Sequence, residues 1–235
     1  MPNAPATTVV NTAKDAGTNE QQHRRIVTRA FRRYFVFAMD RHAQAEGYEQ
    51  APDEALLVAF ANGDSMAGQE LLRRCAPKLY AYATRVLGDR SEAEDVVQET
   101  MIRLWKMAPD WKQGEAKVST WAYRVAVNLC TDRLRARQRK PQVDIDAIAE
   151  PAADLQSAVE RMTDADRENA LQDALSALPD RQRQAVVLRH LEGLTNPEIG
   201  EIMDIGVEAV ESLTARGKRA LAAALAPRKS ELGYE

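Results

Sequence analysis

Residues 119–135, STWAYRVAVNLCTDRLR, are the stretch that best indicates the fold class. Apolar residues recur there with the 3.6-residue period of an α-helix. This period predicts a buried face that consists of Val118, Ala122, Val125, Ala126 and Leu129. Cys130 lies beside this face, and we interpret it as a small buried hydrophobe. The stretch therefore predicts a long amphipathic helix over about residues 119–139.

The opposite face of this predicted helix carries a row of aromatic, amide and charged side chains. The row consists of Trp121, Arg124, Asn128, Asp132 and Arg135. Such groups can stack on bases, hydrogen-bond to base edges and neutralise phosphates along one nucleic-acid strand. The other interpretation is that Trp121 and Tyr123 are core aromatics, and that the arginines only keep the helix soluble.

Working outward, no stretch alternates strictly enough to predict a strand, so we expect an all-α fold. A first block, from about residue 53 to 140, is punctuated into four helices at Pro52, 62–64, 88–89 and 109–114. A second block, from about 166 to 226, is broken at Leu178-Pro179, at Gly193 and at Asp204-Ile205-Gly206. Two small helical domains follow, expected over 51–140 and 166–228.

The composition is that of an ordinary globular chain. The 235 residues carry a net charge of −3, with 45% hydrophobic and 29% charged residues, which excludes a collagen-like or wholly disordered chain. No apolar run approaches the roughly 18 residues of a membrane span, so we expect no membrane insertion. Residues 1–20 lack the pattern of a secretory signal, which favours the cytoplasm. Two cysteines make no disulfide scaffold.

The charge is unevenly distributed along the chain. Residues 23–42 hold six arginines against one aspartate, and residues 131–140 hold four arginines and a lysine against one aspartate. Residues 141–170 hold eight acidic residues against two arginines, and within them 141–165 are predicted to be an acidic, flexible linker. This pattern suggests a polyanion-binding module, although solvated helix ends and a solvated linker would give it too.

Residues 1–50 are expected to be an extension with a disordered start and a basic helix over 21–45. Two interpretations stay open. Translation starts internally at Met39, or the basic helix is a regulatory or DNA-binding addition.

The helix predicted before residue 109 has one face on which acidic and amide side chains surround an isoleucine. Ser91-Glu92-Ala93-Glu94 reads as a capping box that begins it, and its core stripe is Ala93, Val96, Val97, Met101 and Leu104. Its other side carries Asp95, Gln98, Glu99, Ile102 and Lys106. An exposed isoleucine among acids and amides suits a protein contact, but a single exposed isoleucine needs no function.

The second block predicts a helix-turn-helix. Thr195-Asn196-Pro197-Glu198 forms a capping box, followed by the inward-facing Ile199, Ile202 and Met203. After the Gly-containing turn, the inward face of the next helix consists of Val207, Val210, Thr214, Gly217 and Leu221. Gly217 costs about 1 kcal/mol relative to alanine inside a helix, which a close helix contact would explain.

Three ordered motifs together resemble the extracytoplasmic-function (ECF) group of bacterial RNA polymerase sigma factors. DVVQET at 95–100 with RLW at 103–105 resembles the helix that binds core polymerase. Residues 119–135 resemble the helix that melts the promoter and reads its minus-ten element. ALPDRQR at 177–183, leading into the helix-turn-helix, resembles the domain that reads the minus-thirty-five element.

The resemblance implies three sets of site residues. The polymerase-binding set is Asp95, Gln98, Glu99, Ile102 and Arg103. The minus-ten set is Trp121, Arg124, Asn128, Asp132, Arg133, Arg135 and Arg137, with the loop 110–119 helping to hold an unstacked base. The minus-thirty-five set is Glu208, Glu211, Ser212, Arg216, Lys218 and Arg219. The implied partners are core RNA polymerase, promoter DNA and an anti-sigma factor.

The sequence departs from the family pattern in the second of its DNA-reading helices. Glu211 and Leu213 stand where many members have lysine and arginine, so the minus-thirty-five preference is expected to be unusual or weak. Two alternatives to a sigma factor remain, namely a stand-alone helix-turn-helix regulator and a sigma-like protein that sequesters an anti-sigma factor.

No motif predicts catalysis. The three histidines show no metal-ligand spacing with the cysteines, and no Gly-rich phosphate loop or nucleophile motif is present. We therefore expect no enzyme activity, no metal and no cofactor.

Overall fold

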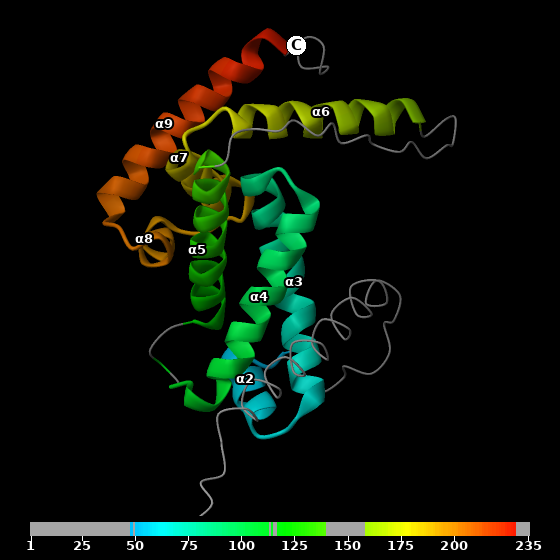
Figure 1. Ribbon diagram of the computed structural model, residues 1–235, viewed down its shortest axis with the longest axis vertical. Helices are drawn as coiled ribbons and strands as arrows, with labels where there is room; N and C mark the ends of the chain where they lie inside the picture. The colour runs from blue at the N-terminus through cyan, green and yellow to red at the C-terminus, as the bar shows by residue number, and fades with distance from the viewer. Residues whose placement is uncertain (1–47, 49, 113, 115–116, 140–157, 229–235) are drawn as a thin grey trace, which may run out of the picture. The chain divides into compact units, whose positions relative to one another are not determined.

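The computed structural model describes residues 48, 50–112, 114, 117–139 and 158–228, with the backbone alone over 158–164 (Figure 1). The predictions made for residues 1–47, including the basic helix over 21–45 and the role of Met39, lie outside the described residues. The described residues form helices and contain no strand, which confirms the all-α fold class.

The first half of the described chain contains the four predicted α-helices. They are α2 (Asp53–Ala61), α3 (Ser65–Leu87), α4 (Arg90–Met107) and α5 (Val118–Arg139), with a short 3-10 turn, η1 (Ala108–Asp110), after α4. The predicted breaks act as expected. Asp64 caps α3 by accepting hydrogen bonds from the backbone N–H groups of Met66 and Ala67, and Gly88 ends it at a φ of 67°.

The predicted start of α4 was two residues too late. Asp89, not Ser91, is its N-cap: the backbone there is extended, and the carboxylate accepts from the backbone N–H of Glu92 at 2.9 Å. Aspartate is as good a cap as serine, so the residue in the extended conformation takes the role.

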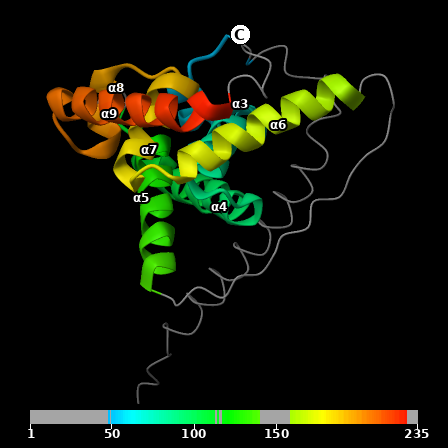
Figure 2. The ribbon, with the colours of Figure 1, turned by 90° about the horizontal axis from the view of Figure 1, so that it is seen from above.

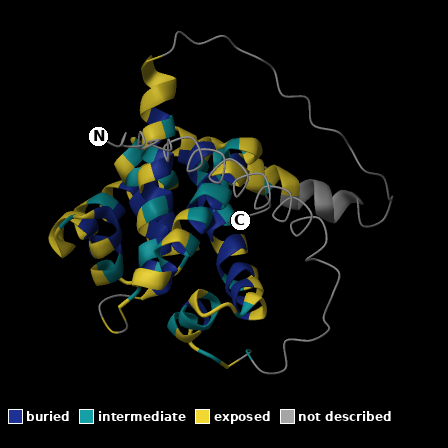
Figure 3. Ribbon diagram, turned by 60° about the horizontal axis from the view of Figure 1, so that its bottom comes forward, coloured by how far each residue is buried: buried dark blue, intermediate teal, exposed yellow. Residues whose placement is uncertain are grey.

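The core of this half surrounds α3, which packs against α2, α4 and α5. Figure 3 shows the buried stripes that these helices turn toward one another. The largest fully buried side chains here are Leu56, Leu57, Leu71, Leu79, Tyr82, Met101 and Leu104. The core stripe predicted for α4 is confirmed in full, and on α5 only Val125 of the predicted face is half-buried.

The second half contains α6 (Ala158–Ser176), α7 (Asp180–Val186), a π-helical turn η2 (Val187–Leu191), α8 (Asn196–Met203), α9 (Val207–Leu225) and a 3-10 turn η3 (Ala226–Arg228). α6 begins inside the segment 141–165 that was expected to be linker. The last eight residues of that segment, 158–165, are therefore helical. Residues 140–157 lie outside the described part.

The helix-turn-helix is formed by α8 and α9, which lie side by side (Figure 2). The capping box of Thr195 and Glu198 is present as predicted, and Asp204 ends α8 in the left-handed conformation with a φ of 54°. The expected close contact at Gly217 is confirmed, because a Cβ there would lie 2.4 Å from Cγ2 of Val186 on α7. The inward placement of Val207 was wrong: it begins α9 and is 41% exposed.

The two halves are in contact with each other. α8 packs on α5, and α6 packs on α3 (Figure 1). None of the helices in the described ranges combines the length and hydropathy that crossing a bilayer requires.

Candidate functional site

The polar face predicted on α4 exists as one stripe. Asp95 and Arg103 are exposed, and Gln98, Glu99 and Ile102 are half-buried. Spacings of three and four residues place all five on one side of the helix. Nε of Arg103 donates to Oε1 of Glu99 at 2.9 Å. Ile102 is less exposed than expected, so it contributes only part of its side chain to this surface.

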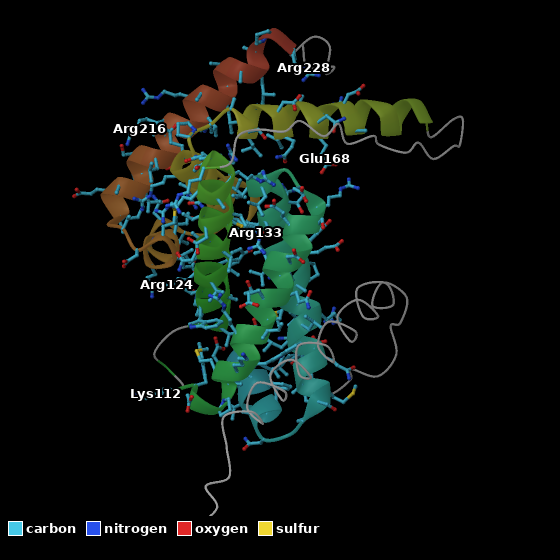
Figure 4. The ribbon with its side chains drawn as sticks, in the orientation of Figure 1. Lys112, Arg124, Arg133, Glu168, Arg216 and Arg228 are labelled. Carbon is cyan, nitrogen blue, oxygen red and sulfur yellow. The ribbon has the colours of Figure 1, made fainter. Side chains whose placement is uncertain are left out.

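The row predicted on α5 also lies on one side of its helix. Arg124, Asn128, Asp132 and Arg135 are exposed, and Trp121 is half-buried (Figure 4 labels Arg124). Tyr123 is buried, with its ring edge-on to that of Tyr82 at a centroid separation of 5.9 Å. The core-aromatic interpretation is therefore right for Tyr123, while Trp121 keeps part of its indole accessible.

The structure separates Arg133 and Arg137 from this row. Arg137 donates to the carbonyl of Leu87 at 2.7 Å and pairs with Glu92 at 3.1 Å. Asp89, the cap of α4, lies 3.9 Å from the same guanidinium. Arg137 thus fastens the end of α5 to the turn between α3 and α4. Arg133 is half-buried.

On α9 the predicted DNA-facing residues are all exposed. They are Glu208, Glu211, Ser212, Arg216, Lys218 and Arg219. Nη2 of Arg216 donates to Oγ of Ser212 at 2.9 Å, and Oε1 of Glu211 accepts from Nδ2 of Asn196 at 3.4 Å. The helix therefore begins with an acidic surface and becomes basic after Ser212.

Sequence reasoning missed two ion pairs that join the halves beside the α5 row. Nζ of Lys117 lies 2.8 Å from Oε1 of Glu198, and Nη2 of Arg124 lies 3.4 Å from Oδ1 of Asp204. The partners are 81 and 80 positions apart in the chain, so no local spacing could have linked them. Hydrogen bonds from Lys117 and from Thr195 lower the pKa of Glu198 to about 2.

A buried carboxylate makes a third missed contact between the halves. The side chain of Glu192 is only 7% exposed; it accepts from the hydroxyl of Tyr123 at 2.8 Å and lies 3.7 Å from Nη1 of Arg85. Burial, with the charge of Glu192 beside it, raises the pKa of the Tyr123 hydroxyl, which therefore stays a neutral donor. Nearby, Nε2 of Gln184 donates to Oγ1 of Thr131 at 2.9 Å.

Arg183, quoted within the ALPDRQR motif, has a structural role. Its buried guanidinium donates to the carbonyls of Leu175, Ser176 and Leu178 at the α6–α7 corner. It also donates to the carbonyl of Val86, near the end of α3, at 2.8 Å. One side chain thus closes the corner and ties it to the first half.

Comparison with known families assigns the two halves separately. The sequence model described as Sigma-70 region 2 matches residues 71–140, and that described as Sigma-70, region 4 matches residues 168–221. The ECF RNA polymerase sigma-E factor of Haemophilus influenzae is 33% identical over 179 residues, which cover 72% of this chain and 93% of that protein. The chain belongs to the ECF sigma factors.

A second ECF relative agrees with this assignment. The ECF RNA polymerase sigma factor SigW of Bacillus subtilis is 32% identical over 169 residues, covering 68% of this chain and 89% of that protein. As an ECF sigma factor, the chain is a transcription-initiation factor that directs RNA polymerase to promoters.

Two solved structures share the fold. CnrH, solved in complex with the cytosolic domain of CnrY, gives a TM-score of 0.57 at 22% identity, covering 74% of this chain and 97% of that chain. The sigma factor RpoE of Bartonella quintana, solved with the anti-sigma factor NepR, gives 0.51 at 22% identity, covering 67% and 95%. These likenesses establish the helical architecture of the ECF sigma factor described above.

Proposed function

We propose that this ECF sigma factor binds core RNA polymerase through the exposed stripe of α4, reads the minus-ten element with α5 and reads the minus-thirty-five element with α9. The observation that carries the proposal is that three polar helix faces, on a chain of this family, remain exposed beside well-packed cores. In this division residues 51–140 form the first functional domain, 141–165 the connection and 166–228 the second.

For the polymerase contact, α4 presents charged side chains around an apolar one. Asp95 is exposed, Glu99 and Arg103 form one ion pair, and Ile102 adds an apolar patch between them. Mixed charge around a small apolar centre is the composition of a protein interface rather than of a nucleic-acid surface.

For the minus-ten contact, α5 supplies the groups that a single strand requires. The accessible part of Trp121 is available for stacking, and Asn128 and Asp132 are exposed where they can hydrogen-bond to a base edge. A base must leave the stack before one strand can be read in this way, which links reading to melting. Arg124 and Arg135 neutralise phosphates.

For the minus-thirty-five contact, α9 presents acids first and bases second. A glutamate accepts a hydrogen bond from cytosine N4 in the major groove, so Glu211 and Glu208 favour cytosine there. Lys218 and Arg219, one to two turns later, are placed for the phosphate backbone. Because carboxylates repel phosphate, this half binds DNA weakly without polymerase.

The same surfaces suit an inhibitory partner. We extend to this chain the kind of partner named for the solved relative RpoE, an anti-sigma factor, which would cover the α4 stripe or the α5 row. The protein acts by binding alone, without catalysis, and does so in the cytoplasm, where bacterial RNA polymerase works.

The decisive experiment is reconstitution of the full chain with bacterial core RNA polymerase on a promoter library. We expect co-elution with the polymerase and promoter-dependent transcripts. Asp95→Lys should reduce both at least about tenfold, since a like-charge contact is costly in an interface. Glu168→Lys is the matched control, because Glu168 is also an exposed carboxylate but lies on α6 (Figure 4).

Each outcome has one interpretation. Failure of the wild-type chain to bind polymerase would reject the proposal. Binding with no transcripts from any promoter would instead support the sequestering alternative. Specific, salt-sensitive binding to duplex DNA by the pure chain, without polymerase, would support the stand-alone regulator.

A further inference from the structure

The first helix of the helix-turn-helix supplies a hydrogen-bond partner to an acidic side chain on the second. Asn196 is the first residue of α8, and Glu211 begins the second turn of α9. Nδ2 of Asn196 donates to Oε1 of Glu211 at 3.4 Å, across 15 positions of the chain. The bond joins α8 to a carboxylate that the proposed function places in the major groove.

The chemistry of this contact determines the orientation of the amide. An amide presents two N–H donors on one side and an acceptor oxygen on the other, whereas a carboxylate only accepts. With the amide turned around, Oδ1 of Asn196 would face Oε1 of Glu211, and the two acceptors would repel each other. Oδ1 is instead shielded from solvent, without a hydrogen-bond partner among the described residues. The bond to Glu211 therefore decides which way the amide points.

The start of α8 is held firmly, so Asn196 has a fixed position. A capping box surrounds it, and the ring of Pro197 restricts φ at the next residue. Ile199 on α8 and Val210 on α9 are both fully buried. Because α8 packs against α9, this shared core sets the register between Asn196 and Glu211 (Figure 2).

The partner of Glu211 is a neutral group. The residues three or four positions away on α9 carry no cation, being Val207, Glu208, Thr214 and Ala215. A cation would neutralise the carboxylate and compete with a base for its oxygens, whereas an amide orients the group and leaves its charge. Asn196 engages Oε1, which leaves Oε2 of Glu211 to accept from the N4 amino group of a cytosine.

A bond of this kind lowers the entropic cost of reading a base. A glutamate without a partner on a helix surface samples several rotamers, and fixing one of them on DNA costs binding free energy. A glutamate already held by an amide has lost part of this freedom before the DNA arrives. The resulting gain in affinity applies to the base that Glu211 accepts from, and so it increases selectivity.

We propose that Asn196 is a positioning residue for base selection: its amide holds the Glu211 carboxylate in the orientation that accepts from cytosine N4, without itself contacting the base. This inference rests on the proposed role of α9 in reading the minus-thirty-five element. It adds to the residues that determine base preference one from α8, the helix that precedes the helix in the groove.

The test measures base selection with the full chain in reconstituted holoenzyme. A promoter library randomised over the minus-thirty-five element, transcribed with wild type and with Glu211→Ala, first identifies the position at which Glu211 selects cytosine. Asn196→Asp then places a second carboxylate opposite Glu211 at similar size, in a first helical turn, where an acid is favourable. We expect the preference for cytosine at that position to fall about three- to tenfold, the cost of ordering one long side chain.

Further variants separate positioning from a structural role. Asn196→Gln keeps an amide donor and should retain part of the preference. In a Glu211→Ala background, Asn196→Asp should change base preference less than about twofold, because the group on which it acts is gone. Asn169→Asp, the same exchange at an exposed position of α6, should leave base preference unchanged. Thermal unfolding should give similar midpoints for wild type and Asn196→Asp, whereas a structural role would lower the midpoint of the variant.

The outcomes separate this inference from the proposed function. If Asn196→Asp lowers transcription by one factor for all four bases, or lowers the cytosine preference equally with and without Glu211, only the positioning role is rejected. If Glu211→Ala itself leaves base preference unchanged while the wild type initiates transcription, Glu211 reads no base and the inference is rejected with that role. If the wild type neither binds polymerase nor initiates transcription, the proposed function fails as a whole.

Discussion

The helices α5 and α9 present polar faces to solvent, but the protein holds them in different ways. α5 buries nine of its 22 residues, among them Val118, Ala126 and Cys130, in the core around α3. α9 buries three of its 19 residues, which are Val210, Thr214 and Gly217. The position of α5 is thus fixed by many buried residues, whereas α9, which packs against α6, α7 and α8, is held by three.

The difference matters because the two helices have different tasks in the proposed function. A helix that holds a flipped base needs a rigid wall, which a large apolar face supplies. A helix that enters a groove needs most of its circumference free, so only one side of it can pack against the rest of the protein. Changes to the few buried residues on that side should destabilise the second half far more than the first.

The largest effect is expected from Arg183→Ala. It would leave the carbonyls of Leu175, Ser176, Leu178 and Val86 without their donor, at a cost of about 3 kcal/mol or more. Urea unfolding would measure the loss, and hydrogen exchange should show it first in α7–α9. The exposed Arg181, changed to alanine, is the control and should cost little. Equal destabilisation of α3–α5 would show that the halves unfold as one unit.

Gly217→Ala comes next. The new Cβ would meet Cγ2 of Val186 at 2.4 Å, and relief requires movement of a buried, β-branched side chain. Overpacking of this kind costs about 1–3 kcal/mol, more than the helix-propensity gain of about 1 kcal/mol. Thermal unfolding should show lower stability, and adding Val186→Ala should restore part of it. Higher stability of the single variant would mean that the α7–α9 contact is loose.

The two DNA-reading helices should differ in salt dependence. Arg135→Ala removes an exposed cation from α5, so the slope of log affinity for single-stranded DNA against log salt should fall by about 0.7. Glu211→Ala should instead leave this slope nearly unchanged and alter base preference at one minus-thirty-five position by about 1–3 kcal/mol. Fluorescence titrations at several salt concentrations, with promoter variants for Glu211, would measure both. Equal slopes for wild type and Arg135→Ala would remove Arg135 from the minus-ten surface.

The smallest expected effect is the loss of stability at low pH when Glu198 is protonated. The pKa of Glu198 is about 2 in the folded protein, because of Lys117 and Thr195, and about 4.3 when unfolded. A lowered pKa stabilises the fold above about pH 4.5, and this contribution is lost as the pH falls toward 2. Glu198→Gln cannot titrate, so its urea midpoint should lie below that of the wild type at pH 7 and converge with it only below about pH 2. A constant difference would show that the charge of Glu198 is unimportant.

The sequence predicted much of the candidate site because the relevant signals are local. The stripe of Asp95, Glu99 and Arg103 and the row from Trp121 to Arg135 follow from helical spacing alone, and the structure places each on one side of its helix. The capping box at Thr195 and the tight approach at Gly217 were predictable for the same reason. Helical spacing and capping motifs do not show which helix packs against which face of another helix.

Two results have this origin. Val207 fits the apolar period of α9, yet it begins the helix and is 41% exposed, so its inward placement was wrong. Arg137 belongs to the basic run expected to meet phosphate, and that role stays a prediction. What the sequence did not indicate is that the turn between α3 and α4 brings Glu92 and the carbonyl of Leu87 to its guanidinium.

The sequence by itself therefore determined the helices, their order, their polar faces and the family, since periodicity, capping residues and motifs act over a few positions. The tertiary structure decided that Glu192 is buried against Tyr123 and that Asp204 and Glu198 pair with the exposed Arg124 and Lys117. Those pairs are formed by residues about 70 to 80 positions apart, and only the packing of α8 on α5 brings them within a few ångströms.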